Sequence, residues 1–236
     1  MTSVSNLLAQ PWMIQLRNVV RDIGPIRAIY KWWMARHDYE EAFGQRLLGA
    51  IGPDSVVWDI GANVGLYTRQ FVQAGAKAVV AFEPAPESVA ILHEAFAADS
   101  GKVRIMPIAL ASAGGKAAFS SDGSSVTNSL VEADDASRPT VEVRVMRADE
   151  ALREFGLEMP TVMKIDVEGY EVDVIRGMGA ILDSPSVRHV FVEVHFRALN
   201  RRDLDGGPSE MVSRLEKAGF TIDWLDLSHL CATRRG

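Results

Sequence analysis

The chain has 236 residues, of which 47% are hydrophobic and 24% charged, and its formal net charge is -6 at pH 7. This composition is typical of one globular domain with a packed core, and the negative charge argues against broad, sequence-independent binding to nucleic-acid phosphates. A single cysteine, Cys231, excludes an internal disulfide, the N-terminus lacks a signal-peptide pattern, and no apolar run reaches the roughly 18 residues of a membrane span, so we expect a cytoplasmic protein without integral membrane association.

Residues 1–50 are predicted to form helices that precede the main domain. Apolar residues recur at helical spacing on both sides of Gly24-Pro25, at Leu16, Val19, Val20 and Ile23 and again at Ile26, Ile29, Tyr30 and Trp33. We interpret this segment as a helical cap, or as a layer packed against the domain. A surface for membranes or anionic partners is the alternative, which the scattered basic residues disfavour.

From residue 51 onward, strand-like and helix-like patterns alternate. Strands are predicted at 56–60, 78–82, 103–108, 162–165, 187–195, 220–225 and 230–233, with helical patterns between most of them. This alternation predicts an α/β fold with a doubly wound, mostly parallel sheet. Two further strands, at 116–120 and 140–147, are predicted as a hairpin inserted before residue 162.

The first strand ends in a glycine-rich turn, in which Asp59 precedes Gly61, Asn63 and Gly65. Ligands of open α/β sheets bind at the carboxyl ends of strands, and glycines let the backbone approach them. A dinucleotide fingerprint needs glycine at 61, 63 and 66, but positions 63 and 66 carry Asn and Leu. The turn therefore favours a ligand without phosphate here, whose ammonium group could donate to Asp59.

Glu83 ends the next strand, about 20 residues beyond the turn, where a carboxylate can accept both hydroxyls of a ribose. Capping of the helix that begins at Pro86 is the alternative role of this side chain. Together, the turn and Glu83 indicate S-adenosylmethionine as the cofactor.

Four motifs follow one another in the chain: D-I-G-A-N-V-G at 59–65, A-F-E-P at 81–84, P-I-A-L-A-S at 107–112 and K-I-D-V-E-G-Y-E at 164–171. They resemble the FkbM family of methyltransferases, over roughly residues 39–196. The resemblance implies a Rossmann-like class I methyltransferase fold over residues 51–236, with a seven-stranded sheet whose last strand is antiparallel. It also implies transfer to hydroxyl oxygens of sugars, glycans or secondary metabolites. From these motifs we expect cofactor contacts at Asp59, Gly61, Ala62, Asn63, Gly65, Glu83, Pro84, Ala109 and Asp166.

Acidic and histidine side chains end two other predicted strands, at Asp166, Glu168, Glu193 and His195. In an extended backbone Asp166 and Glu168 face the same way, and the resemblance places Asp166 beside the methionine part of the cofactor. We expect Asp166, Glu168 and His195 to be catalytic, with His195 or Asp166 as the base, and Glu193 to contact the substrate. The alternatives are a helix-capping role for Glu168 and a satisfied core histidine at 195. All four could instead hold a divalent cation such as Mg²⁺, but no spacing is diagnostic and no metal is assigned.

The polar stretch at 120–140 offers Asn128 and Ser129 as donors to a hydroxylated substrate, or is an ordinary flexible loop. The sequence thus predicts an S-adenosylmethionine-dependent O-methyltransferase that acts on a small hydroxylated molecule, without a nucleic-acid partner. A nicotinamide-dependent oxidoreductase is disfavoured by the missing glycines, and a non-catalytic cofactor-binding module by the acidic and histidine groups. The acceptor and the oligomeric state, for which a homo-oligomer is one alternative, are left open.

Overall fold

The computed structural model describes residues 39–120, 129–130 and 140–235. The helices expected before residue 39 and the expected substrate contact Asn128 lie outside these residues. Within the described part of the chain, no helix is both long and apolar enough to cross a membrane.

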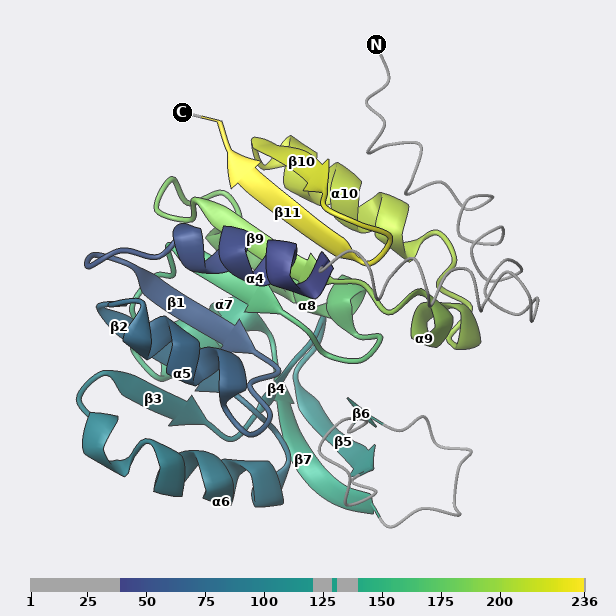
Figure 1. The fold of residues 1–236 in the computed structure, drawn as a ribbon. Helices are drawn as coiled ribbons and strands as arrows, with labels where there is room; N and C mark the ends of the chain where they lie inside the picture. The colour runs from purple at the N-terminus through teal and green to yellow at the C-terminus, as the bar shows by residue number, and fades with distance from the viewer. Residues whose placement is uncertain (1–38, 121–128, 131–139, 236) are drawn as a thin grey trace, which may run out of the picture.

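A seven-stranded sheet occupies the centre of the molecule (Figure 1). Its strands are β1 (Val56–Ile60), β2 (Ala78–Phe82), β3 (Val103–Met106), β8 (Val162–Ile165), β9 (His189–Glu193), β10 (Phe220–Trp224) and β11 (His229–Arg234). They lie in the order β10-β11-β9-β8-β1-β2-β3, and β11 runs opposite to the other six strands of this sheet. The prediction of a mostly parallel sheet with an antiparallel last strand is confirmed. The strand predicted at 187–195 is shorter, so His195 lies beyond its end.

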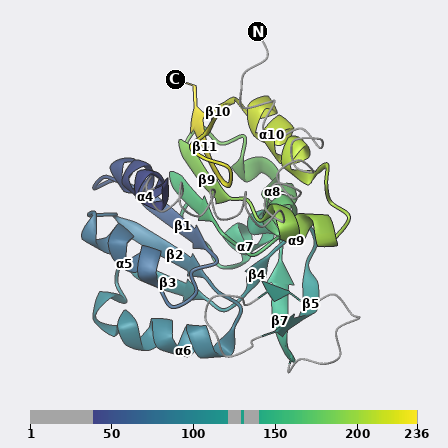
Figure 2. The same ribbon diagram turned by 45° about the vertical axis from the view of Figure 1, so that its right-hand side comes forward.

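Helices cover both faces of this sheet (Figures 1 and 2). The described helices are α4 (Tyr39–Gly49), α5 (Leu66–Gln73), α6 (Pro86–Ala95), α7 (Ala148–Glu154), α8 (Glu171–Gly177), α9 (Phe196–Arg201) and α10 (Gly207–Lys217), with short 3₁₀ turns η1 (Ala97–Asp99) and η2 (Gly179–Ile181). All five residues of β1 are buried, as expected of a strand covered on both sides.

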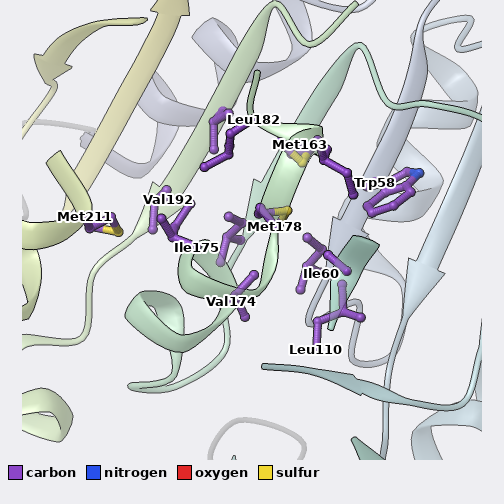
Figure 3. Close-up of a cluster of buried hydrophobic side chains, with 14 of the residues drawn as sticks. Trp58, Ile60, Leu110, Met163, Val174, Ile175, Met178, Leu182, Val192 and Met211 are labelled. Carbon is purple, nitrogen blue, oxygen red and sulfur yellow. The ribbon is translucent and has the colours of Figure 1, made fainter. Parts of the chain in front are cut away.

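Alternate residues of β1 enter different hydrophobic clusters, because successive side chains of a strand point to opposite faces. Trp58 and Ile60 belong to the same buried cluster as Ile175 of α8 and Met211 of α10, and Figure 3 shows Met211 beside Val192 of β9. Val57 packs on the other face with Phe43 of α4 and with residues of α5 and α6. Hydrophobic packing on both faces therefore holds β1 in place at the centre of the sheet.

The predicted hairpin is present as part of a second, four-stranded sheet. Its strands are β4 (Ala109–Leu110), β5 (Gly115–Ser120), β6 (Ser129–Leu130) and β7 (Thr140–Met146), in the order β4-β7-β5-β6. Strand β4 begins three residues after β3 ends, so this small sheet starts at the carboxyl edge of the main sheet (Figure 2).

Candidate active site

The turn after β1 is packed against the protein's own backbone. Gly61 has a φ of 81°, and a Cβ atom there would lie 1.8 Å from the carbonyl oxygen of Asp166. Gly65 has a φ of 86°, and its Cβ would lie 2.7 Å from side-chain atoms of Leu92 and Phe96. Glycine is thus required at both positions by left-handed backbone and by protein neighbours. The turn that we expect to hold the cofactor is consequently in direct contact with the end of β8.

Glu83 is almost completely buried, with 5% of its surface exposed. The backbone N–H groups of Asn63 and Ala85 each donate to one of its carboxylate oxygens, at 2.8 Å in both cases. Because Ala85 is the N-cap residue of α6, the capping alternative holds for one oxygen. Burial raises the pKa of Glu83, although the two N–H groups oppose this effect. Each oxygen keeps a lone pair, so the ribose role stays a prediction.

Asp59 does not reach the surface, which corrects the expectation that it contacts a ligand ammonium group. Its side chain is fully buried. The Thr68 hydroxyl donates to its Oδ2 at 2.6 Å, and the Lys164 ammonium lies 3.5 Å from its Oδ1. Burial raises the pKa of Asp59, while Lys164 and Thr68 lower it. Asp59 therefore has a structural role next to the turn, where it pairs with Thr68 and Lys164 inside the protein.

The other predicted cofactor contacts lie around this turn and the start of the small sheet. Ala62 and Ala109 are buried, with 5% and 8% of their surface exposed, and Pro84 is half-buried after Glu83. Their contacts with a cofactor stay predictions.

The imidazole of His195 lies among four carboxylates. Its Nδ1 is 2.7 Å from Oε1 of Glu171, and its Nε2 is 3.4 Å from Oε2 of Glu168. The same Nε2 lies 3.8 Å from Oδ1 of Asp166 and 3.8 Å from Oε1 of Glu193. The structure therefore brings together all four side chains that the sequence placed at this edge. It adds Glu171, the last acid of the K-I-D-V-E-G-Y-E motif, to which the sequence assigned no role.

The two carboxylates after β8 converge for a different reason than the one predicted. The strand ends at Ile165, and Glu168 and Gly169 have positive φ angles of 51° and 102°. The sequence argument applied only if the backbone from Asp166 to Glu168 were extended, and this condition is not met. Instead, a tight turn directs both side chains toward His195.

Helix α9 packs onto this turn and carries His195 at its start. A Cβ atom at Gly169 would lie 2.4 Å from the Cβ of Ala198, so only glycine fits beneath the helix. Arg202, which follows α9, donates to the carbonyl of Gly169 at 2.6 Å and stacks over Tyr170 at 3.7 Å. His195 is the N-cap residue of α9. In Figure 2, α9 lies beside α8, in agreement with these contacts.

The charges around His195 change its expected role. Burial lowers the pKa of His195, but its hydrogen bond to the Glu171 carboxylate and the charges of Glu171, Glu168 and Asp166 outweigh burial and raise it to about 9. The ring is then a cation at neutral pH, which conflicts with the predicted role as a general base. Burial raises the pKa of Glu168, and the neighbouring carboxylates add to this against the opposing charge of His195. A carboxylate of raised pKa is better suited to accept a proton.

A second histidine, which the sequence did not single out, lies behind Glu193. The Nδ1 of His229 is 2.6 Å from Oδ2 of Asp226, and its Nε2 is 3.6 Å from Oε2 of Glu193. Burial lowers the pKa of His229, but Asp226 and Glu193 raise it to about 9. Phe43 of α4 packs on this ring at 4.3 Å between centroids. Helix α4 thus contacts His229, whose ring pairs with the carboxylate of Glu193.

The cluster also bears on the alternative of a metal site. Among the described residues, one candidate ligand atom each from Asp166, Glu168 and His195 lie within 4.8 Å of one another. Carboxylate oxygens and an imidazole nitrogen suit a divalent cation. Of the four residues that the sequence offered as ligands of a divalent cation, these three thus remain candidates.

Comparisons with known proteins concern the family and the fold of this chain. A family model described as the methyltransferase FkbM domain matches residues 59–222. Hexuronic acid methyltransferase AglP of Haloferax volcanii is 30% identical over 149 residues, which cover 63% of this chain and 59% of that protein. The 31-O-demethyl-FK506 methyltransferase FkbM of Streptomyces tacrolimicus is 28% identical over 223 residues, covering 78% of this chain and 81% of that protein.

Solved structures share the fold. The crystal structure of methyltransferase FkbM from Methylobacillus flagellatus KT has a TM-score of 0.54 at 13% identity, covering 77% of this chain and 44% of that chain. SMU.1697c from Streptococcus mutans, solved in complex with SAH, has a TM-score of 0.50 at 12% identity, covering 83% of this chain and 97% of that chain. The main sheet is therefore a class I, Rossmann-like methyltransferase sheet, as predicted.

Proposed function

The chain belongs to the FkbM family of methyltransferases, and from this premise we propose that it transfers the methyl group of S-adenosylmethionine to a hydroxyl oxygen of a small acceptor. The observation that carries the proposal is the cluster of Asp166, Glu168 and His195 beside the glycine turn, with the Asp166 backbone against Gly61. An acceptor hydroxyl that enters this cluster would meet proton-accepting carboxylates next to the cofactor turn. Family membership sets the oxidoreductase alternative aside.

The cofactor site is proposed at the carboxyl ends of β1 and β2. Glu83 is oriented by two backbone N–H groups before any ligand binds, which lowers the entropy cost of holding a ribose. Gly61, Asn63 and Gly65 have positive φ angles, and the two glycines keep side chains away from the backbone at both ends of this turn. When bound, S-adenosylmethionine supplies an activated methyl group on a sulfonium leaving group.

We propose Glu168 as the general base in place of His195. Its Oε2 lies 3.4 Å from Nε2 of His195, and its side chain is 37% exposed, so it is open to an acceptor. Asp166 is paired with Lys164 at 3.1 Å, and Glu171 with His195 at 2.7 Å, whereas Glu168 shares a cation that already has a closer partner. Glu168 would take the hydroxyl proton as the oxygen attacks the methyl carbon. His195 and Asp166 would hold the acceptor and Glu168 in line, and such alignment supplies much of the rate in bimolecular transfer.

Acceptor choice is proposed to rest on the surroundings of this cluster. AglP is named for a hexuronic acid and the Streptomyces relative for methylation at an oxygen of FK506, so a sugar or secondary-metabolite hydroxyl is the class that we propose. Glu193, 37% exposed beside His195, is the proposed acceptor contact in the main sheet, and Ser129 of β6 is one in the small sheet. The cap formed by residues 1–50 stays a proposal, of which the structure describes α4.

Two measurements test the function. Isothermal titration with S-adenosylhomocysteine should give saturable binding, and its absence would refute the cofactor assignment. Incubation with methyl-labelled S-adenosylmethionine and a panel of hydroxylated sugars and metabolites should place the label on oxygen, as read by mass spectrometry. Tight cofactor binding without transfer to any acceptor would favour a non-catalytic module, and transfer to nitrogen would contradict the proposed acceptor group.

A further inference from the structure

We propose that Lys164 is a positioning residue, which holds the cofactor turn and the catalytic Asp166 in one fixed relation. This inference rests on the proposed function. Lys164 lies in β8, next to β1 in the centre of the sheet, and 4% of its side chain is exposed. The other three residues of β8 are the buried apolar side chains Val162, Met163 and Ile165. A charged residue in such a strand is costly unless its partners compensate it.

The ammonium group of Lys164 has oxygen partners from both halves of the site. Its Nζ donates to the carbonyl oxygen of Gly61 at 3.0 Å and lies 3.5 Å from Oδ1 of Asp59. On the other side it lies 3.1 Å from Oδ2 of Asp166. The Gly61 carbonyl accepts a hydrogen bond from this ammonium group, and the carboxylates of Asp59 and Asp166 form ion pairs with it. The side chain thus joins the end of β1, the glycine turn and the end of β8.

This bridge determines which oxygen of Asp166 is available for chemistry. With Oδ2 held by Lys164, Oδ1 of Asp166 faces the imidazole of His195 at 3.8 Å. Without the ammonium group, the Asp166 side chain could rotate and Gly61 would lose the donor to its carbonyl oxygen. The glycine turn and the carboxylate of Asp166 would then no longer be held in one position relative to each other.

Charge balance supports the same role. Burial lowers the pKa of Lys164, but Asp166 and Asp59 raise it well above its ordinary value, so the bridge stays charged throughout the working pH range. Asp59 is fully buried, and Lys164 is the cation nearest to it among its described ion pairs. Removal of Lys164 alone would leave a buried carboxylate without its counter-charge, which destabilises proteins strongly. A test therefore needs a charge-balanced variant.

The experiment compares Lys164→Met/Asp59→Asn with Asp59→Asn, Lys164→Arg and the wild type. Lys77→Met is the matched control, because Lys77 is an exposed lysine whose ion pair with Glu158 lies away from the site. Hydrogen exchange of the ligand-free proteins should show faster exchange at 60–66 and 165–170 in the double variant, with α10 unchanged. With S-adenosylmethionine and the hydroxylated sugar or metabolite of the panel that the wild type methylates, the double variant should lose about 100-fold in kcat, as expected for a misplacement of roughly 1 Å. The kcat of Lys164→Arg should lie between those of the double variant and the wild type. Hydrogen exchange at 165–170 should stay near that of the wild type in both Asp59→Asn and Lys77→Met.

The outcomes separate this inference from the proposed function. Wild-type exchange in both segments of the double variant, or wild-type kcat, would overturn the role of Lys164. Faster exchange across the whole sheet and α10 would assign Lys164 a general structural role and would also overturn it. If the wild type binds no S-adenosylhomocysteine, the proposed function fails, but exchange in the ligand-free protein still decides whether Lys164 holds the two segments.

Discussion

The Nδ1 atom of His195 lies 2.7 Å from Oε1 of Glu171, whose side chain is completely buried. The backbone N–H of Gly169 donates to the same oxygen at 2.9 Å, so this carboxylate cannot rotate freely. It therefore fixes the ring of His195 with Nε2 toward Glu168 and Asp166. A buried carboxylate that holds a histidine in this way also stabilises the imidazolium form.

Replacement of Glu171 by glutamine should lower the pKa of His195 from about 9 toward its ordinary value of 6.5. The reason is that the variant lacks the negative charge that does most to stabilise the imidazolium form. The pH at which the His195 ring titrates can be followed by NMR. Asp226→Asn is the matched control, since it removes the same kind of partner from His229. An unchanged titration of His195 in the Glu171→Gln variant would contradict the assignment.

Replacement of Glu168 by glutamine should lower kcat by about 100- to 10,000-fold, the range expected when a general base is lost. The affinity for S-adenosylhomocysteine should stay near that of the wild type, because Glu168 does not line the cofactor turn. Glu216→Gln, an exposed glutamate of α10, is the control. Wild-type kcat in Glu168→Gln would return the base assignment to Asp166 or His195.

Replacement of Glu83 by alanine should weaken binding of S-adenosylhomocysteine by about 10- to 100-fold, since charge-assisted hydrogen bonds contribute about 1.5–3 kcal/mol. In this variant the backbone N–H of Ala85 also loses its acceptor, which should cost about 1 kcal/mol of stability. Titration calorimetry and thermal unfolding measure the two effects separately. Glu94→Ala, on the exposed side of α6, should change neither, and equal affinities of Glu83→Ala and wild type would rule out the ribose role.

Replacement of Gly61 by alanine should destabilise the protein far more than replacement of Gly75. Both residues have positive φ, 81° and 87°, so both variants bear the left-handed backbone cost of about 1–2 kcal/mol. Only at position 61 would the new Cβ overlap the carbonyl oxygen of Asp166, at 1.8 Å, whereas nothing lies within 4 Å at position 75. Urea unfolding measures the difference, and equal losses would show that the turn does not pack on β8 as described.

The stability of the protein should fall as pH rises from 6.5 to about 9. The folded pKa of His229 is raised from 6.5 to about 9, so its contribution is complete below pH 6.5 and is lost as pH rises through 9. This contribution is on the order of 2 kcal/mol, after allowance for partial screening of the site. His229→Gln should therefore show a smaller decrease in unfolding free energy between pH 6 and 9.5 than the wild type. The same decrease in both proteins would show that His229 does not carry it.

Local patterns in the sequence predicted the parts of the fold that local physics decides. Strands at 56–60, 78–82 and 162–165 were predicted with the limits observed, because continuous apolar runs bounded by glycine or acidic residues indicate buried parallel strands. The antiparallel last strand and the family were predicted from motifs, since their order and spacing are properties of the chain itself. The rule that parallel strands end at one edge placed Asp166 and His195 near each other, but the turn at Glu168 and Gly169 is what directs both carboxylates toward His195.

Tertiary structure alone decided what those residues can do. Glu171 lies 24 positions before His195, and the contact forms because α9 packs over Gly169. The burial of Asp59 and its pairing with Lys164 depend on β8 lying beside β1, although more than 100 residues separate these strands. Protonation of His195 depends on the carboxylates of Asp166, Glu168 and Glu171, which lie in one stretch of the chain and meet the ring only when α9 packs onto that stretch. Residue types and spacing determine which groups reach the site edge, but long-range packing determines their burial and neighbouring charges, and these decide which group accepts a proton.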